Sequence, residues 1–211
     1  MKTAKDLKIP FVWADRRPIL LDRFFYIPGR YEYSKNQFPF FDDARPVIIE
    51  YCSGNGQWIG ERAGQNPQYN WIAVEKNFAR ARQIWLKIHR EKIPNLLVVC
   101  GEGMVFTRYY APQAAEIYIN FPDPWPKLRH AKHRLVRKEF LQDLPVPAGG
   151  KAICATDDPP YAQEMKIEFA KCPEWKLLFA TNEWPHYGSS FFNDLWIKKG
   201  RTIHYLSYER L

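Results

Sequence analysis

Short apolar runs recur along the chain from residue 46 onward. The run from Val47 to Tyr51 is almost continuously apolar, which predicts a strand buried on both faces of a sheet. Runs of the same kind predict four further strands, at 71–74, 96–100, 117–119 and 151–155. Two last runs, at 177–179 and 202–206, predict an antiparallel pair that closes the sheet. Seven strands are therefore expected.

The stretches between these runs have helical spacing. Phe78, Ala81, Trp85 and Ile88 recur every three or four residues, which predicts a helix over 78–89 with one apolar face. Helices are predicted in the same way from residue 58, over 135–144 and over 161–170. Because strands and helices alternate, the pattern predicts a doubly wound α/β fold, whose sheet is mostly parallel and carries helices on both faces.

Residues 1–45 lack this alternation. They mix basic and aromatic side chains, namely Arg16, Arg17, Arg23, Phe24, Phe25, Tyr26, Arg30 and Tyr31. A chain of 211 residues is long enough for one domain with a full core. We therefore predict an N-terminal arm over 1–45 that packs on a single α/β domain over 46–211.

The charge balance of the chain points to a class of partner. The formal net charge is +8 and the sequence pI is about 9.3. This balance favours a polyanionic partner such as a nucleic acid or an anionic membrane. A membrane span is not expected, because no apolar stretch approaches the roughly 20 residues that a span needs.

The four cysteines are Cys52, Cys100, Cys154 and Cys172, and no pair of them has CxxC spacing. This argues against a zinc site or a thioredoxin-like motif. The first three lie in or next to predicted strands, where cysteine is usually a small buried hydrophobic residue. We therefore expect a cytoplasmic protein with no metal and no membrane association.

Acidic residues and glycines follow the first three strands of the main domain. In a doubly wound sheet, ligands bind at the carboxyl ends of the strands. Glu50 precedes the glycine turn of Gly54 and Gly56, Glu75 ends the second strand, and Glu102 follows the third. Three carboxylates would repel a phosphate, but they suit an adenosine that carries a cationic sulfonium. This favours S-adenosylmethionine over NAD as the cofactor.

The fourth strand is followed by the run from Asn120 to Lys127, which contains three prolines. Prolines fix φ and stiffen the backbone, so Asp123 and Trp125 would be held in place before a substrate arrives. The densest basic cluster of the chain, 127–138, comes next. Beside a ligand site, such a cluster is suited to gripping RNA phosphates.

The segment from Asn120 to Phe140 resembles one known family. It reads Asn-Phe-Pro-Asp-Pro-Trp-Pro-Lys, then Arg129-His130, Lys132, Arg134-Leu-Val and Phe140-Leu. The bacterial tRNA (guanine-N7-)-methyltransferases read almost the same there. The resemblance covers about residues 46 to 208, and further matches are Glu-x-x-x-Gly-x-Gly at 50–56, Val74-Glu75, Gly101-Glu102, Thr156-Asp157 with Tyr161-Ala162, and Gly200.

The resemblance implies a Rossmann-like methyltransferase fold and a role for each matching residue. Glu50, Gly54, Gly56, Glu75, Glu102 and Asp123 would bind S-adenosylmethionine. Asp123 would also be the catalytic residue, between cofactor and guanine. Lys127 and Asp157 would contact the substrate.

Three parts of the chain depart from the family pattern. The family has a Thr-x-Phe/Tyr-Glu segment near its C-terminus, and Ser190 to Asn193 aligns with it, which would make Ser190 and Asn193 substrate-binding residues. A different register, starting at Thr181, puts Trp184 at the Glu position. Cys52 stands where the family commonly has glycine, and Glu102 where it usually has aspartate.

The function that the resemblance implies is transfer of a methyl group to N7 of a guanine in tRNA. Guanine N7 has a lone pair and no proton, so the enzyme mainly aligns the reactants and needs no general base. Asp123 would stabilise the positive charge that grows on the purine, and Trp125 could stack on the flipped base. We expect a monomer or a weak homodimer. Two alternatives stay open: a methyltransferase on another RNA base or a small molecule, and a tRNA-binding protein that has lost catalysis.

Overall fold

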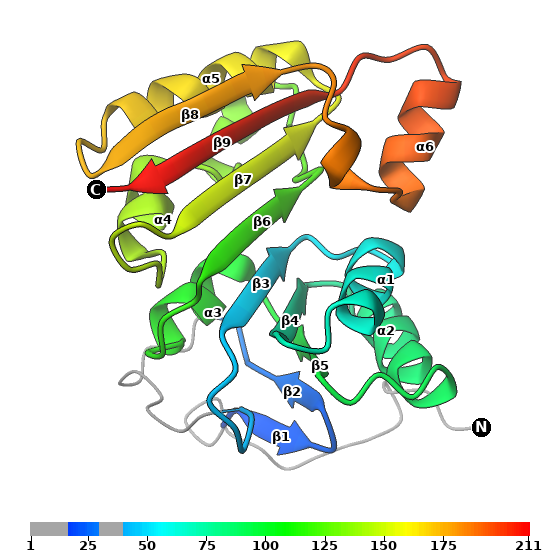
Figure 1. Ribbon diagram of the computed structural model, residues 1–211. Helices are drawn as coiled ribbons and strands as arrows, with labels where there is room; N and C mark the ends of the chain where they lie inside the picture. The colour runs from blue at the N-terminus through cyan, green and yellow to red at the C-terminus, as the bar shows by residue number, and fades with distance from the viewer. Residues whose placement is uncertain (1–16, 30–39) are drawn as a thin grey trace.

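The predicted strands assemble side by side in the computed structural model, which describes residues 17–29 and 40–211 and forms one nine-stranded sheet within them (Figure 1). The strands are β1 (Ile19–Leu21), β2 (Phe24–Tyr26), β3 (Val47–Tyr51), β4 (Asn70–Glu75), β5 (Leu96–Cys100), β6 (Glu116–Asn120), β7 (Lys151–Thr156), β8 (Trp175–Thr181) and β9 (His204–Arg210). Their order across the sheet is β1-β2-β5-β4-β3-β6-β7-β9-β8.

The middle of the sheet is parallel and both of its ends are antiparallel. Strands β2, β5, β4, β3, β6 and β7 pair in parallel, whereas β9 runs antiparallel between β7 and β8. The chain builds outward from β3 in one direction through β4 and β5, then returns to build β6 and β7 on the other side of β3. The strand order therefore reverses between β3 and β6, and a doubly wound sheet binds its ligand at such a reversal.

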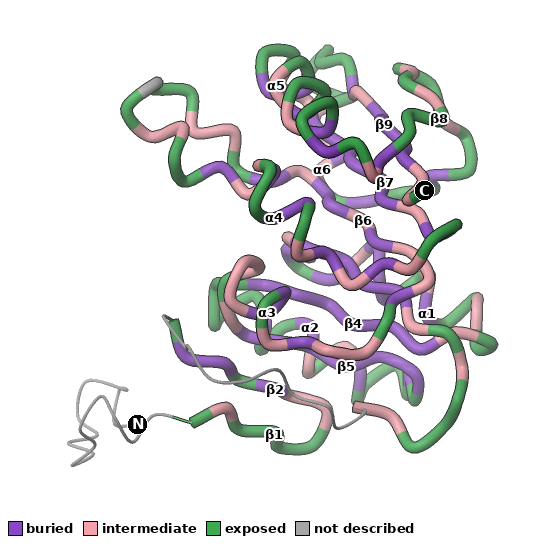
Figure 2. Tube along the Cα trace, turned by 90° about the vertical axis from the view of Figure 1, so that its left-hand side faces the viewer, coloured by how far each residue is buried: buried purple, intermediate pink, exposed green. Residues whose placement is uncertain are grey.

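Helices cover both faces of the sheet (Figure 1). They are α1 (Gln57–Gln65), α2 (Phe78–Arg90), α3 (Gly103–Tyr109), α4 (Lys138–Asp143), α5 (Pro159–Ala170) and α6 (Phe191–Lys198), with 3-10 turns η3 (Leu128–His133) and η4 (Pro185–Tyr187). Apolar side chains of α1 and α2 form one core layer with the sheet, and those of α3, α4 and α5 form the other. The strands between these layers are mostly buried (Figure 2).

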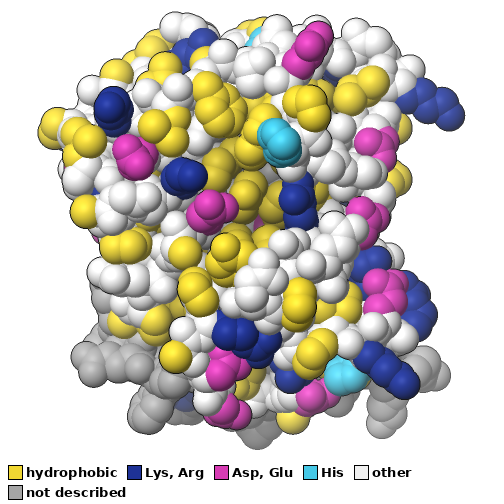
Figure 3. Space-filling view, viewed as in Figure 1, with side chains coloured by type: hydrophobic (Ala, Val, Ile, Leu, Met, Phe, Trp, Pro, Cys, Tyr) yellow, Lys and Arg dark blue, Asp and Glu magenta, His cyan; other side chains and the backbone are white. Residues whose placement is uncertain are grey.

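The α6 helix contributes one partly buried side chain, Trp196, to the core layer of α1 and α2. It lies beyond the carboxyl ends of β6 and β7 (Figure 1), and the ring of its Phe192 lies against Gly54 in the turn after β3. On the face seen in Figure 3, hydrophobic side chains gather in the upper half, where β8 and β9 lie. Leu177 and Leu178 of the edge strand β8 are exposed.

The predicted fold class is confirmed, including the antiparallel pair at the C-terminus. Strands β3 and β5 have the predicted bounds, and α2 and α5 lie within two residues of theirs. The helix predicted over 135–144 was wrong at its start, because α4 begins only at Lys138. Arg134 and Arg137 are extended, and the intervening Val136 is buried in the core. The segment before α4 is therefore extended, and it buries Val136 without forming a helix.

Part of the predicted N-terminal arm belongs to the sheet. Residues 19–26 form the β1–β2 hairpin, and β2 pairs in parallel with β5. The sheet thus gains two strands beyond the seven predicted. Residues 1–16 and 30–39, which include Arg16, Arg30 and Tyr31, lie outside the described residues. The division of the chain at residue 45 stays a prediction. Across the described segments, none of the helices has the length and apolarity required to traverse a bilayer.

Candidate active site

A cavity of about 680 Å³ opens at the carboxyl ends of β3, β4, β5 and β6. This volume is typical of small-molecule sites. Its acidic lining residues are Glu75, Glu102, Asp123 and Asp157, and its basic ones are Lys76, Arg80, Lys132, Arg134, Arg137 and Arg201. The cavity therefore offers carboxylates to a cationic ligand and a basic rim to an anionic one. Within the described ranges, no group of His, Cys, Asp and Glu side chains is arranged to hold a metal ion.

Glu75 is fixed in the cavity wall by two backbone groups. Its Oε2 accepts a hydrogen bond from the Gly54 amide at 2.9 Å, and its Oε1 accepts one from the Asn77 amide at 2.7 Å. Each carboxylate oxygen can accept a second hydrogen bond, so Glu75 can still receive two hydroxyl groups. Burial raises the pKa of the Glu75 carboxyl. The geometry suits a ribose diol.

The turn between β3 and α1 needs its glycines. Gly54 and Gly56 have φ of 57° and 71°, a region that residues with a Cβ rarely adopt. A Cβ on Gly56 would also lie 2.7 Å from Cγ1 of Ile84. Neither of these two predicted cofactor-binding glycines is among the residues that line the cavity. Gly54 acts through its amide, which orients Glu75.

Cys52 is the third residue of this turn with a positive φ, which is 64°. Cys52 is one of the residues that line the cavity, and its sulfur takes up space that a glycine there would leave open. Burial, followed by the nearby charges of Glu75 and Asp123, raises the pKa of the Cys52 thiol. The sulfur is therefore a neutral thiol at physiological pH and a poor nucleophile.

Glu50, predicted to bind the cofactor, lies behind the cavity wall instead of lining it. Its side chain is buried, and Oε1 accepts a hydrogen bond from Nδ2 of Asn120 at 2.6 Å. Its Oε2 is buried and has no hydrogen-bond partner among the described residues. Burial raises the pKa of Glu50 to about 7, and the nearby charge of Glu75 adds to this.

Replacing Glu50 should change how stability depends on pH. The pKa of Glu50 in the folded protein, about 7, lies above its ordinary value. Stability from the protonated carboxyl is therefore fully present below pH 4.5 and is lost as pH rises through 7. Glu50→Gln stays neutral, so we expect it to unfold at the same temperature as wild type near pH 4.5 and to be more stable by roughly 2–3 kcal/mol at pH 8. Thermal unfolding of both proteins over this range checks it, and a pH-independent difference would contradict it.

Asp123 lies in the cavity wall with Pro122, Pro124 and Trp125. Its Oδ2 pairs with Nζ of Lys76 at 2.6 Å, and both side chains are more than half exposed. The same Nζ lies 5.7 Å from the centre of the Trp125 ring. Lys76 directly follows Glu75, so this ion pair places the predicted catalytic carboxylate next to the carboxylate that suits a ribose diol.

Asp157 follows β7 and forms an ion pair with Arg201, which precedes β9. The guanidinium carbon of Arg201 lies 4.2 Å from the centre of the Trp196 ring on α6. Trp196 and Phe192 also line the cavity. The sequence analysis missed Lys76, Arg201, Phe192 and Trp196. Their positions beside Glu75 and Gly200 were signals for the first two. The motif at 190–193 was a signal for α6, but Phe192 and Trp196 line the cavity in place of Ser190 and Asn193.

The remaining predicted residues divide into two groups. Glu102 lines the cavity at the start of α3, whereas Lys127 is exposed and is not one of the lining residues. Ser190 and Asn193 are buried. Ser190 Oγ accepts a hydrogen bond from the Asn193 amide at 3.0 Å, which caps α6, and Asn193 Oδ1 accepts one from the Tyr205 hydroxyl at 2.6 Å. The structure thus gives these two side chains internal partners, and it does not bring them or Lys127 to the cavity wall.

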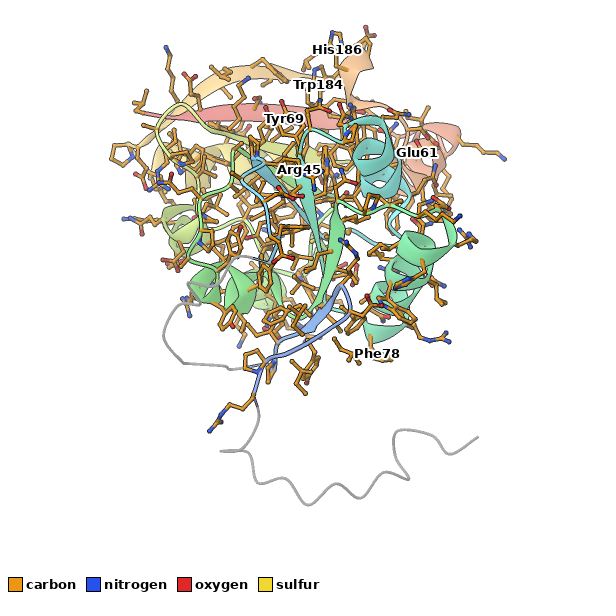
Figure 4. All side chains as sticks on the ribbon, turned by 60° about the horizontal axis from the view of Figure 1, so that its bottom comes forward. Arg45, Glu61, Tyr69, Phe78, Trp184 and His186 are labelled. Atoms are coloured by element: carbon orange, nitrogen blue, oxygen red, sulfur yellow. The ribbon has the colours of Figure 1, made fainter. Side chains whose placement is uncertain are left out.

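Trp184, which the other register of the C-terminal motif puts at the Glu position, also lies away from the cavity. Figure 4 shows it next to His186 in the η4 region. Its ring packs against Phe179, Tyr187 and Tyr205. Trp184 is therefore part of the hydrophobic packing beneath η4.

The sheet order, the glycine turn and the carboxylates at the ends of β4 and β5 define a Rossmann-like methyltransferase. Residues 44–206 match the family described as "Putative methyltransferase". Among solved structures, the 16S rRNA methyltransferase KamB is similar in fold, with a TM-score of 0.60 and 18% sequence identity over 79% of this chain and 88% of that one.

The sequence relatives define the family more narrowly. A tRNA (guanine-N(7)-)-methyltransferase of Chlamydia caviae is 40% identical to this chain, covering 97% of it and 96% of the relative. The protein of the same name from Chlamydia muridarum is 40% identical over 94% of both chains. The chain belongs to the tRNA (guanine-N(7)-)-methyltransferase family, and it is an enzyme of this type.

Proposed function

We propose that this protein transfers a methyl group from S-adenosylmethionine to N7 of a guanine in tRNA, which gives 7-methylguanosine. The observation that carries the proposal is the position of Asp123. This carboxylate lies in one cavity with Glu75 and pairs with Lys76, the residue after Glu75. The η3 turn, which carries basic residues, begins five positions later in the chain. A methyl donor and an RNA base can therefore meet beside one negative charge.

The cavity fits the cofactor in charge and in hydrogen bonding. Glu75 keeps free lone pairs for the ribose hydroxyls, and Gly54 orients Glu75 through its amide. Cys52 would bring the backbone after β3 close to the ligand. Glu102 would face the adenosine from β5. S-adenosylmethionine would supply a methyl group on a positively charged sulfur. The carboxylates of the cavity wall attract such a positive charge, whereas they would repel the phosphate groups of a dinucleotide.

The residues of this chain act by positioning and by charge. Guanine N7 has no proton to remove, so no general base is required. The N7–methyl bond would form as the sulfur–methyl bond breaks, which releases S-adenosylhomocysteine. Positive charge would then move from sulfur to the purine, where the Asp123 carboxylate would stabilise it. Asp157 and Lys127 are proposed to contact the nucleotide, and Trp125 to stack on the base once it leaves its helix. Ser190 and Asn193 would support the substrate side through α6.

The basic rim would bind the tRNA backbone. Lys132 and Arg137 are two of the basic residues that line the cavity. Lys132→Gln should raise KM for tRNA several-fold, leave kcat nearly unchanged and lower the slope of log KM against log salt by about one phosphate contact. Lys176→Gln, on the exposed edge strand β8, is the matched control and should change neither value. An unchanged salt slope in Lys132→Gln would exclude Lys132 from RNA contact.

The test of the function is transfer of labelled methyl groups to unmodified tRNA, followed by nucleoside analysis. A control transcript made with 7-deazaguanosine lacks the N7 lone pair and should accept no methyl group. The proposal is confirmed if 7-methylguanosine appears in the guanosine transcript and no methyl group appears in the 7-deazaguanosine transcript. A different methylated nucleoside would favour the alternative of a methyltransferase that acts on another RNA base. Binding of tRNA without any transfer would favour a tRNA-binding protein that has lost catalysis. The expected monomer or weak homodimer and the cytoplasmic site of action stay predictions.

A further inference from the structure

One arginine of the basic cluster, Arg134, is largely buried although it contributes to the cavity wall. Arg134 is 8% exposed, whereas its neighbours Lys132 and His133 are exposed. Its Nε donates a hydrogen bond to the carbonyl oxygen of Pro124 at 2.7 Å, and its Nη2 donates one to the carbonyl oxygen of Trp125 at 3.2 Å. The planar guanidinium thus holds two successive carbonyl groups of the loop that carries Asp123.

The other side of the guanidinium is anchored on α5. Nη1 forms an ion pair with the carboxylate of Glu164, and the guanidinium carbon lies 5.4 Å from the centre of the Tyr161 ring. The Tyr161 hydroxyl accepts a hydrogen bond from the Val136 amide at 3.2 Å, so that ring is itself fixed. Arg134 therefore connects the loop to a rigid helix of the core.

The loop needs such an anchor because its backbone is strained at both ends. Phe121 and Trp125 have φ of 48° and 44°, a region that costs a residue with a Cβ about 1–2 kcal/mol. At the first end, the Phe121 amide donates to the carbonyl oxygen of Ala155 at 2.8 Å, within the sheet. At the second end, Arg134 supplies the hydrogen bonds. Asp123 lies between these two attachments.

We propose that Arg134 is a positioning residue for methyl transfer, which holds the Pro124–Trp125 backbone so that Asp123 and the Trp125 ring face the cavity. This inference rests on the proposed function. Only arginine offers several donors in one plane, so it can hold two carbonyl groups and a carboxylate at once. Lysine keeps the charge beside Glu164 but offers a single point of contact.

The test compares Arg134→Lys and Arg134→Gln with wild type, and uses Arg108→Gln as the matched control. Arg108 forms an exposed ion pair with Asp143 and is not one of the residues that line the cavity. For both Arg134 variants we expect kcat to fall about 10²-fold, since a displacement of about 1 Å can cost that much. The Kd for S-adenosylhomocysteine should stay within about threefold of wild type, because Glu75 is not moved. Amide hydrogen exchange of residues 121–127 should become faster. Arg108→Gln should match wild type in all three.

Three results would overturn the inference. Arg134→Lys with wild-type kcat and exchange would show that only the charge beside Glu164 matters. A rise in KM for tRNA at unchanged kcat would make Arg134 a phosphate contact. Unchanged exchange with lost kcat would place its effect outside the loop. Amide exchange and S-adenosylhomocysteine binding need no turnover, so they test the role of Arg134 even if the wild-type protein makes no 7-methylguanosine. That last result would refute the proposed function and not the role of Arg134. If Arg134→Gln fails to fold, Arg134→Lys decides.

Discussion

Asp123→Ala is expected to lower the rate of methyl transfer to tRNA by about 10³-fold, with the fold intact. The magnitude is that of removing one group that stabilises charge in the transition state. The side chain is 60% exposed and its ion pair with Lys76 lies at the surface, so its loss should change the free energy of unfolding by no more than about 0.5 kcal/mol. Single-turnover kinetics, together with thermal unfolding, measure both effects.

Asp123→Asn separates charge from shape. It keeps the size of the side chain and one acceptor oxygen but loses the negative charge, so we expect it to be nearly as slow as Asp123→Ala. Lys76→Met is a companion variant, because it frees the Asp123 carboxylate while keeping its charge. We expect this variant to lose much less activity. Near-normal turnover by Asp123→Ala would remove Asp123 from the mechanism.

Glu75→Ala is expected to weaken binding of S-adenosylhomocysteine by at least about 10²-fold. Two hydrogen bonds from the ribose would be lost, and each bond to a charged acceptor contributes about 1.5–3 kcal/mol. The variant should also unfold more easily, because the Gly54 and Asn77 amides lose their acceptor. Calorimetry with S-adenosylhomocysteine and thermal unfolding measure the two effects.

Two further variants make this result interpretable. Glu75→Gln keeps one oxygen for the backbone amides and should be more stable than Glu75→Ala but still bind weakly. Glu61→Ala, on the exposed side of α1 (Figure 4), is the matched control and should bind as wild type does. Tight binding by both Glu75 variants would mean that the ribose site lies elsewhere in the cavity.

The residues found from the sequence share one physical property. Glu75, Glu102, Asp123 and Asp157 all follow apolar runs that form buried parallel strands, and the carboxyl ends of such strands meet at one edge. Their convergence could therefore be predicted before any coordinates were known. Glu50 follows the same rule along the chain, but its side chain turns behind the wall toward Asn120.

Other features depend on contacts between distant segments. Arg134 belongs to a basic cluster, and charge alone predicts that it faces solvent and RNA. It is buried instead, because Glu164 and Tyr161 on α5 and the carbonyl groups of the proline loop converge around it. Its extended conformation also delays the start of α4 beyond the position that apolar spacing predicts.

The sequence by itself determined the fold class, the strands that carry the site and the family, since each rests on local periodicity or on a contiguous motif. Tertiary structure decided which side chains reach the cavity. Ser190 and Asn193 turn inward to cap and anchor α6, whereas Lys76 and Arg201 turn toward Asp123 and Asp157. The direction of a polar side chain depends on partners that are distant in the chain, and neither periodicity nor composition encodes those partners.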